Sequence, residues 1–501
     1  MIHLAARHAI IVGGGASGVM LAYQLLKNRE PGLRVTLIER QPEIGRGSAY
    51  HTHNPEHLLN VRAANMSALP DDPEHFWRWL TNRPGGAPCP DSYCFVPRRI
   101  YGDYLASLVE PLTADADASS GLTILHAQCT EIDESPSGVT VTLADGACLI
   151  GDAAVLATGN DGAASRLPLH TDPWAASSTI DRNATVLILG TGLTMVDYVL
   201  SLLRDGHQGA IIAMSRRGLL AKAHRRTHPM KIDEADVPFG ASATQLLRWL
   251  RRQIATHMAD GGDWRSVIDA IRPFTQRLWQ ELPTSSKRRF LEHARAWWDV
   301  HRHRMAPEVE MRITQALAAG RLLMLPAKIA AIDPNEAGAL VHYRRRGQRQ
   351  LAGLQVGVIV DCTGIVKDPL ASSNPLIQDL VEKGQARADT LKIGIDVAED
   401  CAVVGRRGVA SRRLFAVGPL TRSAFWEIVA VPDIRKQCAD LAARLLTALK
   451  QSAPSRDKTA FATTVLAVQP QFAIAQPFPG PAESLLPQSD ASPPRTAGTA
   501  A

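Results

Sequence analysis

Three glycines near the N-terminus have the spacing of a turn that binds phosphate. Gly13, Gly15 and Gly18 follow a strand predicted over residues 9–12 and open a helix predicted over residues 16–27. Gly13 permits a tight turn, Gly15 lets the backbone approach a pyrophosphate, and Gly18 allows the helix to pack closely on the strand. The start of the helix offers N–H groups and a positive dipole end to the phosphates. The pattern therefore predicts a dinucleotide-binding turn.

An acidic residue completes this pattern. Glu39 ends the next predicted strand, residues 34–39, where its carboxylate can accept hydrogen bonds from a ribose and repel a 2′-phosphate. The turn belongs to a domain that the chain enters again much later, which favours FAD as the dinucleotide. A glycine-rich turn in another kind of α/β protein is the alternative. We expect Ser17 and Arg40 to belong to the same cofactor site.

A second turn, Gly190-Thr-Gly192, follows a strand predicted over residues 185–189 but lacks the third glycine. The strand after it, residues 210–214, ends in Ser215-Arg216-Arg217, where NAD sites carry an acid. Hydroxyl and guanidinium groups match a 2′-phosphate in geometry and in charge. The triplet therefore favours NADPH over NADH, with a solvated basic turn as the alternative.

Two βαβ units must position these turns. The opening element occurs twice, and so does a closing strand, which ends at Thr158-Gly159 in the first copy; we include both residues in the cofactor site. The duplication predicts an α/β fold with two Rossmann-like dinucleotide-binding domains, the second inserted in the first. The expected ranges are 1–165 and 355–450 for the FAD domain, 180–350 for the NADPH domain with a helical insertion over 220–310, and 451–501 for a disordered, proline-rich tail.

The composition is that of a globular protein. Of the 501 residues 45% are hydrophobic and 21% are charged, which excludes a fibrous or wholly disordered chain. No apolar run reaches the roughly 18 residues of a membrane helix, and the N-terminus lacks the pattern of a signal peptide. Seven cysteines, an odd number, favour free thiols in a reducing compartment. We therefore expect a soluble cytoplasmic protein.

The basic residues gather in one segment. The net charge is +6, and most of the excess lies between residues 220 and 310, a stretch that also holds several tryptophans. Acidic residues are interleaved there, so an anionic small molecule fits better than a nucleic acid. His301, His303 and Arg304 are the candidate substrate-binding residues in this segment, and a solvated, internally paired helix face is the alternative. Two histidines at i and i+2 point to different sides of a helix, so we expect no metal site.

These motifs, in this order, resemble a known family: the two-dinucleotide-domain flavoproteins of the FAD/NAD(P)-binding group, related to flavin-dependent N-hydroxylating monooxygenases. The resemblance extends to about residue 450. It is carried by the stretches IIVGGGASG, GRGSAYHTHNPEHLLNVRAANMS, FVPRRIYGDYL, LATG, LGTGLTMVD, WDVHRHR, DCTG and LFAVGP.

The resemblance implies further site residues. Gly45, Arg46 and Gly47 match the segment along the phosphate and ribose of the flavin, while Leu59 and Asn60 match the stretch beside the isoalloxazine; plain core is the alternative for Leu59. At the C-terminal end, Gly418 and the helix that begins at Pro432 match the segments that reach the ribityl chain and the flavin pyrimidine. Pro419 stands where relatives commonly carry an aspartate, which puts the ribityl contact in doubt. Asn60 and Trp426 are the candidate catalytic residues.

The resemblance also implies a reaction. NADPH would reduce FAD, O₂ would add to give a hydroperoxyflavin, and the amine of a small carboxylated substrate, such as an amino acid, would take the distal oxygen. The alternative is a flavin-dependent NAD(P)H reductase or dehydrogenase that passes electrons to a non-oxygen acceptor. A redox disulfide between Cys89 and Cys94 would suit that alternative, but the pair lies well beyond the position that flavin disulfide reductases use. A flavin-binding protein associated with nucleic acid is a third hypothesis.

Overall fold

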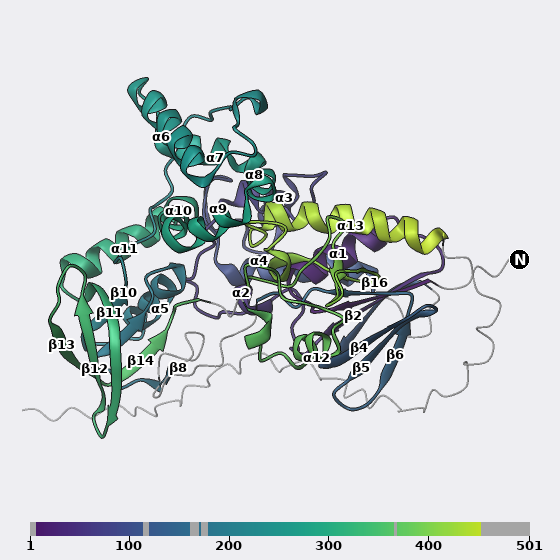
Figure 1. The fold of residues 1–501 in the computed structure, drawn as a ribbon, viewed down its shortest axis with the longest axis horizontal. Helices are drawn as coiled ribbons and strands as arrows, with labels where there is room; N and C mark the ends of the chain where they lie inside the picture. Colours follow the sequence, from purple (N-terminus) through teal and green to yellow (C-terminus); the bar gives the residue numbers. More distant parts are fainter. Residues whose placement is uncertain (1–6, 114–119, 161–169, 172–178, 365–367, 452–501) are drawn as a thin grey trace, which may run out of the picture. The chain divides into compact units, whose positions relative to one another are not determined.

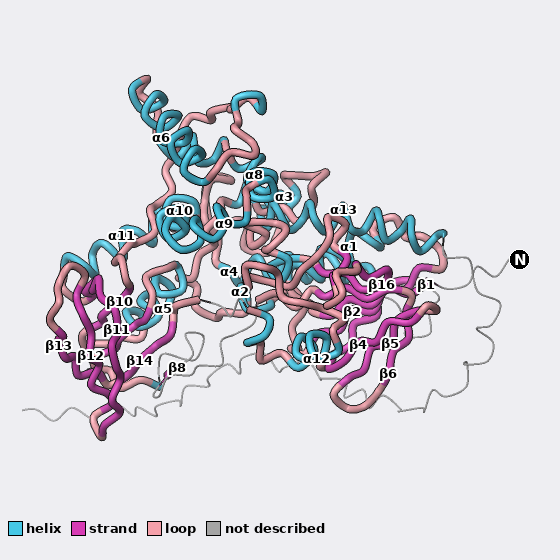
Figure 2. The backbone as a smooth tube through the Cα atoms, in the orientation of Figure 1, coloured by secondary structure: helices cyan, strands magenta, loops and turns pink. Residues whose placement is uncertain are grey.

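A computed structural model describes residues 7–113, 120–160, 170–171, 179–364 and 368–451 (Figure 1). The tail predicted over 451–501 lies outside these ranges except for its first residue. Within the described ranges, no helix combines the length and apolar character needed to cross a membrane. Helices and strands alternate through both ends of the chain, and a run of helices interrupts them in the middle (Figure 2).

The first sheet has six strands in the order β15-β16-β7-β1-β2-β3. All neighbours run parallel except β15, which pairs antiparallel with β16. The strands are β1 (Arg7–Val12), β2 (Leu33–Glu39), β3 (Gly121–His126), β7 (Ala153–Leu156), β15 (Ala402–Val404) and β16 (Ala410–Ala416). The last four residues of β1, Ala9–Val12, are all apolar because a parallel sheet of this kind is covered on both faces.

The two faces of this sheet have different covers. Ala9 and Ile11 pack in a core with α1 (Ala16–Leu26), α4 (Arg98–Val109) and α13 (Val431–Gln451). Ile10 and Val12 point the other way and pack in a second core with a small antiparallel sheet and α12 (Pro375–Lys383). The small sheet contains β4 (Cys129–Ser135), β5 (Gly138–Leu143) and β6 (Cys148–Gly151). On the first of these faces α1 and α13 lie against each other (Figure 1).

The second sheet has seven strands in the order β13-β12-β11-β10-β9-β14-β8, and in sequence all of them lie between β7 and β15. Its strands are β8 (His170–Thr171), β9 (Val186–Leu189), β10 (Ile211–Ser215), β11 (Leu322–Asn335), β12 (Gly338–Arg345), β13 (Leu351–Val356) and β14 (Val358–Asp361). α5 (Leu193–Arg204) and α11 (Pro307–Ala318) pack on one face. The antiparallel strands β12 and β13 contribute side chains to the core on the other face.

The helical insertion follows β10. It contains α6 (Ala243–Ala259), α7 (Trp264–Ala270), α8 (Thr275–Glu281), α9 (Thr284–Arg289), the π-helix η6 (Phe290–Ala294) and α10 (Arg295–Arg302). α6 begins with a reciprocal capping box between Ser242 and Gln245, which satisfies N–H groups at its start. Two short helices, α2 (Gly47–Tyr50) and α3 (His75–Asn82), pack against α4.

Candidate active site

Two positions of the first glycine turn, Gly13 and Gly18, leave no room for a side chain. Gly13 has a φ of 111°, and a Cβ there would lie 2.4 Å from the carbonyl oxygen of Ala157. A Cβ on Gly18 would lie 1.9 Å from the carbonyl oxygen of Gly13. Gly15 is the N-cap of α1 and provides no side-chain cap, so the first N–H groups of this helix have no side-chain acceptor at the cap. Such a helix start suits a phosphate.

The other residues predicted for this site surround the turn. Glu39 Oε2 accepts a hydrogen bond from the N–H of Gly14 at 2.7 Å, which holds the carboxylate beside the turn. Within the described residues, the buried Thr158 Oγ1 has no hydrogen-bond partner and can therefore meet a polar group of a bound molecule. A Cβ on Gly15 would lie 3.5 Å from the Cα of Gly47, so both glycines border the same approach to the backbone. A Cβ on Gly418 would lie 2.3 Å from Ser17 Oγ. Two further residues predicted for this site lie at open positions. Gly159 has a φ of 72° and open space where a Cβ would lie, and Arg40 is exposed.

Two of the predicted cofactor residues have side chains committed to the protein. Arg46 donates to Asp103 Oδ1 and to the carbonyl oxygen of Arg99, each at 2.5 Å, and so ties its loop to α4. A Cβ on Gly45 in the same loop would lie 2.9 Å from the backbone of α4. Leu59 is 3% exposed and lies in the hydrophobic core. The side chains of Arg46 and Leu59 therefore hold the loops together.

The second glycine turn repeats the geometry of the first. Gly190 has a φ of 99°, and a Cβ there would lie 2.3 Å from the carbonyl oxygen of Cys362. Gly192 is the N-cap of α5, without a side-chain cap and with nothing within 4 Å of a Cβ built there. The start of α5 is therefore as open to an anion as the start of α1.

The three polar residues after β10 differ in their contacts. Ser215 Oγ lies 2.9 Å from Thr191 Oγ1 and accepts the N–H of Gly218 at 2.9 Å. Arg217 donates to the carbonyl oxygen of His293, in the π-helix, at 3.1 Å. Arg216 is exposed and has no hydrogen bond or ion pair with the rest of the described chain. Of the two arginines, Arg216 is thus the one whose guanidinium is available to a ligand.

A cavity of about 720 Å³ brings together residues that are far apart in the sequence. Asn60 from the first domain, Pro432 from the first turn of α13, and His303 and Arg304 after α10 all line it. Seven arginine and lysine side chains line the cavity against four carboxylates: Arg62, Arg272, Arg302, Arg304, Arg435, Lys436 and Arg444 against Asp269, Glu399, Asp433 and Asp440. The cavity is therefore polar with a basic surplus.

Several of these charges are already paired. Arg304 pairs with Asp269, and Arg272 Nη2 lies 2.9 Å from Asp433 Oδ2. Burial lowers the pKa of the Arg304 guanidinium, although Asp269 opposes that effect. Burial also lowers the pKa of His303. The imidazole of His303 and the guanidinium of Arg304 are therefore poorly solvated. An anionic group of a ligand would meet fewer competing waters beside them.

His224 is a cavity residue that sequence reasoning missed. Its Nε2 lies 3.0 Å from the carbonyl oxygen of Asn60, and its ring packs 5.0 Å from the ring of Phe95. Burial, aided by the nearby charge of Arg304, lowers the pKa of His224 to about 3, so the imidazole is neutral near pH 7. A neutral ring that donates through Nε2 presents Nδ1 as an acceptor. No local motif marks His224, because only the fold brings it to Asn60.

Glu427 holds the end of α10. It is buried, has a φ of 65°, and accepts from Arg302 Nε at 2.9 Å and from Trp298 Nε1 at 2.5 Å. A positive φ in a residue with a Cβ is costly and persists only where contacts hold it. Arg302 lines the cavity, so Glu427 positions one of its walls. Within α10, Arg295 Nε lies 3.2 Å from Asp299 Oδ2.

Two of the predicted residues lie elsewhere. His301 and Trp426 line a separate, apolar cavity within the helical insertion, and His301 Nδ1 donates to the carbonyl oxygen of Trp297 at 2.7 Å. The structure therefore groups His303 and Arg304 with Asn60 but does not group His301 or Trp426 with them. The separation of His301 from His303 follows from their i, i+2 spacing. Within the described residues, no cluster of three or more His, Cys, Asp or Glu is placed to hold a metal.

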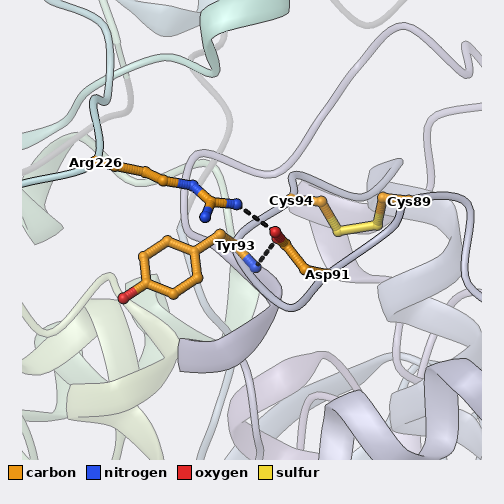
Figure 3. Close-up of a disulfide and its surroundings, with 5 residues drawn as sticks. All are labelled: Cys89, Asp91, Tyr93, Cys94 and Arg226. Carbon is orange, nitrogen blue, oxygen red and sulfur yellow. Dashed lines mark hydrogen bonds and ion pairs between the residues drawn. A yellow bond between two sulfur atoms is a disulfide. The ribbon is translucent and has the colours of Figure 1, made fainter.

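The expectation that the cysteines are thiols is wrong for one pair. Cys89 and Cys94 form a disulfide with their Cα atoms 6.0 Å apart (Figure 3). Their loop turns back within five residues, and this brings the two Cα atoms into the range that a disulfide spans. In the same loop Asp91 pairs with Arg226, whose guanidinium lies 4.7 Å from the ring centroid of Tyr93. The other five cysteines form no disulfide.

The comparisons with known proteins agree with this geometry. Residues 10–161 match a family model described as FAD-NAD(P)-binding. No curated protein sequence matches the chain.

Solved structures with the same fold cover most of the chain. An ornithine N-hydroxylase from Kutzneria sp. 744, solved with reduced FAD, NADP⁺ and L-ornithine, is 15% identical, with a TM-score of 0.60 over 88% of this chain and 99% of that one. A cadaverine monooxygenase bound to FAD from Erwinia amylovora is 13% identical, with a TM-score of 0.56 over 89% and 95%. A bacillithiol disulfide reductase from Staphylococcus aureus is 12% identical, with a TM-score of 0.50 over 89% and 99%. The predicted fold class and the resemblance to two-dinucleotide-domain flavoproteins are confirmed.

Proposed function

We propose that this chain is an FAD-dependent, NADPH-consuming monooxygenase that hydroxylates the amine of a small carboxylated substrate. One observation carries the proposal: two helices, α1 and α5, begin at glycine turns without side-chain caps, and a polar cavity lies where Asn60 meets the first turn of α13. Two dinucleotides and one polar substrate fit that arrangement. The ornithine and cadaverine enzymes of the same fold act on amines, which supports the substrate class.

The residues present fit FAD at the first turn. Gly15 and Gly47 leave the backbone open to a pyrophosphate, Glu39 holds a carboxylate beside the turn, and Thr158 offers an unpartnered hydroxyl. When bound, FAD supplies hydride acceptance from NADPH and the activation of O₂. Every other task belongs to the chain, which must bind both dinucleotides, orient the amine and exclude water.

The ribityl contact is the part of the fit that differs from relatives. Pro419 has no N–H, and the N–H of Gly418 donates to Gln437 Oε1 at 2.8 Å. Gln437 in turn donates from Nε2 to Thr421 Oγ1 at 3.0 Å. Gln437 lines the cavity and holds the loop at Pro419 through these two hydrogen bonds. We propose that Gln437 takes the part of the missing aspartate by fixing this loop.

The cavity suits a molecule with a carboxylate. We assign the carboxylate to the neighbourhood of His303 and Arg304, where guanidinium groups outnumber carboxylates. Neutral His224 holds the backbone at Asn60, whose side chain lines the cavity and can orient a flavin, a nicotinamide or an amine. The amine must be uncharged to react as a nucleophile, and a basic, poorly hydrated wall favours the uncharged form.

The test is a product balance. The FAD-loaded protein is supplied with NADPH and O₂ in the presence of diamines, amino acids and other carboxylated amines, and hydroxylamine, peroxide and NADP⁺ are counted. Without a substrate, NADPH oxidation should release peroxide. With the right substrate, the proposal expects hydroxylamine and NADP⁺ in equal amounts and little peroxide. NADPH oxidation that requires an added acceptor and proceeds without O₂ would instead establish a reductase, the second candidate, which the disulfide reductase of the same fold favours.

A further inference from the structure

The helical insertion contains a cavity of about 760 Å³ that the proposed reaction does not use. We call it the tryptophan cavity. Its walls come from α6, α7, α8, the π-helix η6, α10 and the residues Ile271, Leu282 and Trp426 outside these helices. Its aromatic members are Trp249, Trp264, Trp279, Phe290, Trp297, Trp298 and Trp426. A cavity of several hundred Å³ with mostly apolar walls has the size and character of a small-molecule site.

The tryptophans present ring surface to this cavity. Trp279 donates its Nε1–H to the carbonyl oxygen of Ser423 at 2.8 Å, and Trp298 donates its Nε1–H to Glu427. Trp279 and Trp426 stack with ring centroids 4.3 Å apart. Because Trp279 and Trp298 have their polar edges satisfied by groups outside the cavity lining, their contribution to the cavity is apolar.

Large apolar side chains at the rim of the tryptophan cavity are exposed to solvent. Leu247, Met258 and Trp297 line it and are 40%, 52% and 47% exposed. A cluster of large exposed apolar side chains commonly marks a binding site. The π-helix Phe290–Ala294, a rare backbone form that occurs often at functional sites, contributes Phe290 and His293 to the same wall.

Arg251 gives the lining of this cavity a positive charge, and Glu292, which lies 3.6 Å from His293 Nε2, is outside the lining. Arg251, His293 and His301 line it, and no aspartate or glutamate does within the described residues. We infer that the tryptophan cavity binds a second ligand with an apolar body and an anionic head group, of the class of an alkyl or aryl carboxylate. The apolar body lies against the tryptophan rings, and the carboxylate lies at the rim beside Arg251.

This site is distinct from the proposed reaction site. Arg302 and His303 line the polar cavity, whereas Trp297, Trp298 and His301 of the same helix line the tryptophan cavity. The helix α10 and Glu427 therefore form the wall between the two. A ligand that fills the tryptophan cavity contacts the helix that carries Arg302.

Calorimetric titration of the FAD-loaded, full-length protein with sodium decanoate, without NADPH or substrate, tests the inference. Decyltrimethylammonium provides the same apolar body with the opposite charge. The expected result is saturable, one-site binding of decanoate that is at least about tenfold tighter than that of the cation, as follows from contact with one guanidinium.

Three variants locate the site. Ile254→Trp fills the cavity from α6 and is expected to weaken decanoate binding by about tenfold or more, since a filled pocket has no room for the chain. Arg251→Glu is expected to weaken it by roughly fivefold, the scale of an exposed ion pair. Arg252→Glu is the matched control, because Arg252 is exposed on the same helix but does not line the cavity, and it should leave binding unchanged.

The inference is overturned if decanoate does not bind, if it binds as well as the cation binds, or if Arg251→Glu and Arg252→Glu have equal effects. A self-associated protein that fails to bind decanoate and that Met258→Asp converts to a monomer would assign the exposed rim to a second copy of the chain. These readouts involve no turnover, so they are independent of whether the chain is a monooxygenase. If Ile254→Trp fails to fold, the comparison of Arg251→Glu with Arg252→Glu, both on the surface of α6, still decides the outcome.

Discussion

Arg98 Nη2 lies 2.8 Å from Asp197 Oδ2, in an ion pair whose side chains are 14% and 9% exposed. Arg98 begins α4 beside the first sheet, and Asp197 lies in α5 beside the second. His57 adds to this contact, because its Nε2 lies 2.9 Å from the carbonyl oxygen of Asp197 and 2.9 Å from Ser201 Oγ. A charged, nearly buried contact therefore joins α4, which packs against α1, to α5, which begins at the second glycine turn.

Removing one partner of this pair should cost more than removing both. Asp197→Asn leaves the Arg98 guanidinium buried without its counter-charge, and we expect a loss of about 3–5 kcal/mol in the free energy of unfolding. The double variant Arg98→Met with Asp197→Leu should recover most of that loss, since it leaves no buried charge. Urea unfolding of the three proteins measures the difference. A double variant less stable than Asp197→Asn would contradict the interpretation.

Alanine substitutions at two glycines of the first turn should have different effects, one on folding and the other on FAD binding. Gly13→Ala places a Cβ 2.4 Å from a carbonyl oxygen at a φ of 111°, so we expect misfolding or a large loss of stability. Gly15→Ala meets nothing closer than 3.5 Å, at an ordinary φ of −73°. It should fold normally but bind FAD at least about tenfold more weakly, because its methyl group occupies the approach to the pyrophosphate. Thermal unfolding and flavin fluorescence titration make the comparison, and unchanged FAD affinity in Gly15→Ala would refute it.

Sequence patterns predicted the two glycine turns, because each turn is formed by residues that are close together in the chain. A glycine turn is specified by the backbone angles at Gly13 and Gly190, and those angles can be inferred from residue type and spacing. The polar cavity could not be predicted in this way, since it joins Asn60, His224, Arg302 and Pro432, which only the packing of helices and sheets brings together. The tryptophans of the insertion gave a signal, but their pattern did not show that they enclose a cavity.

Arg216 should determine the choice between the nicotinamide dinucleotides. Its guanidinium is exposed at the end of β10, while Arg217 is held by the carbonyl oxygen of His293. Arg216→Ala is expected to raise the KM for NADPH by roughly ten- to a hundredfold, the scale of a lost charged hydrogen bond, and to leave the KM for NADH nearly unchanged. Steady-state NAD(P)H oxidation with each cofactor measures both values. Equal changes for NADPH and NADH would remove Arg216 from the 2′-phosphate site.

The Cys89–Cys94 disulfide should make a modest contribution to stability. The loop that it closes spans a sequence separation of five, and the chain-entropy relation gives about 2 kcal/mol for a loop of this length. We expect the double variant Cys89→Ser with Cys94→Ser to unfold at lower urea than the oxidised wild type. Dithiothreitol should lower the stability of the wild type to that of the variant and leave the variant unchanged. If dithiothreitol leaves the wild type unaffected, the disulfide carries no such contribution.

His224 should make the folded protein sensitive to acid. Burial, together with the charge of Arg304, lowers its pKa to about 3 in the folded state, whereas an imidazole in the unfolded chain titrates near 6.5. Between these values the unfolded state binds more protons, so stability is full above about pH 6.5 and falls as the pH falls towards 3, by at most about 1.4 kcal/mol per pH unit. Gln at this position can still donate to the carbonyl oxygen of Asn60 but does not titrate. Urea unfolding of wild type and His224→Gln at pH 7, 6 and 5 should therefore show a difference that shifts in favour of the variant as the pH decreases. A difference that stays constant over this range would mean that His224 is charged, or unburied, in the folded protein.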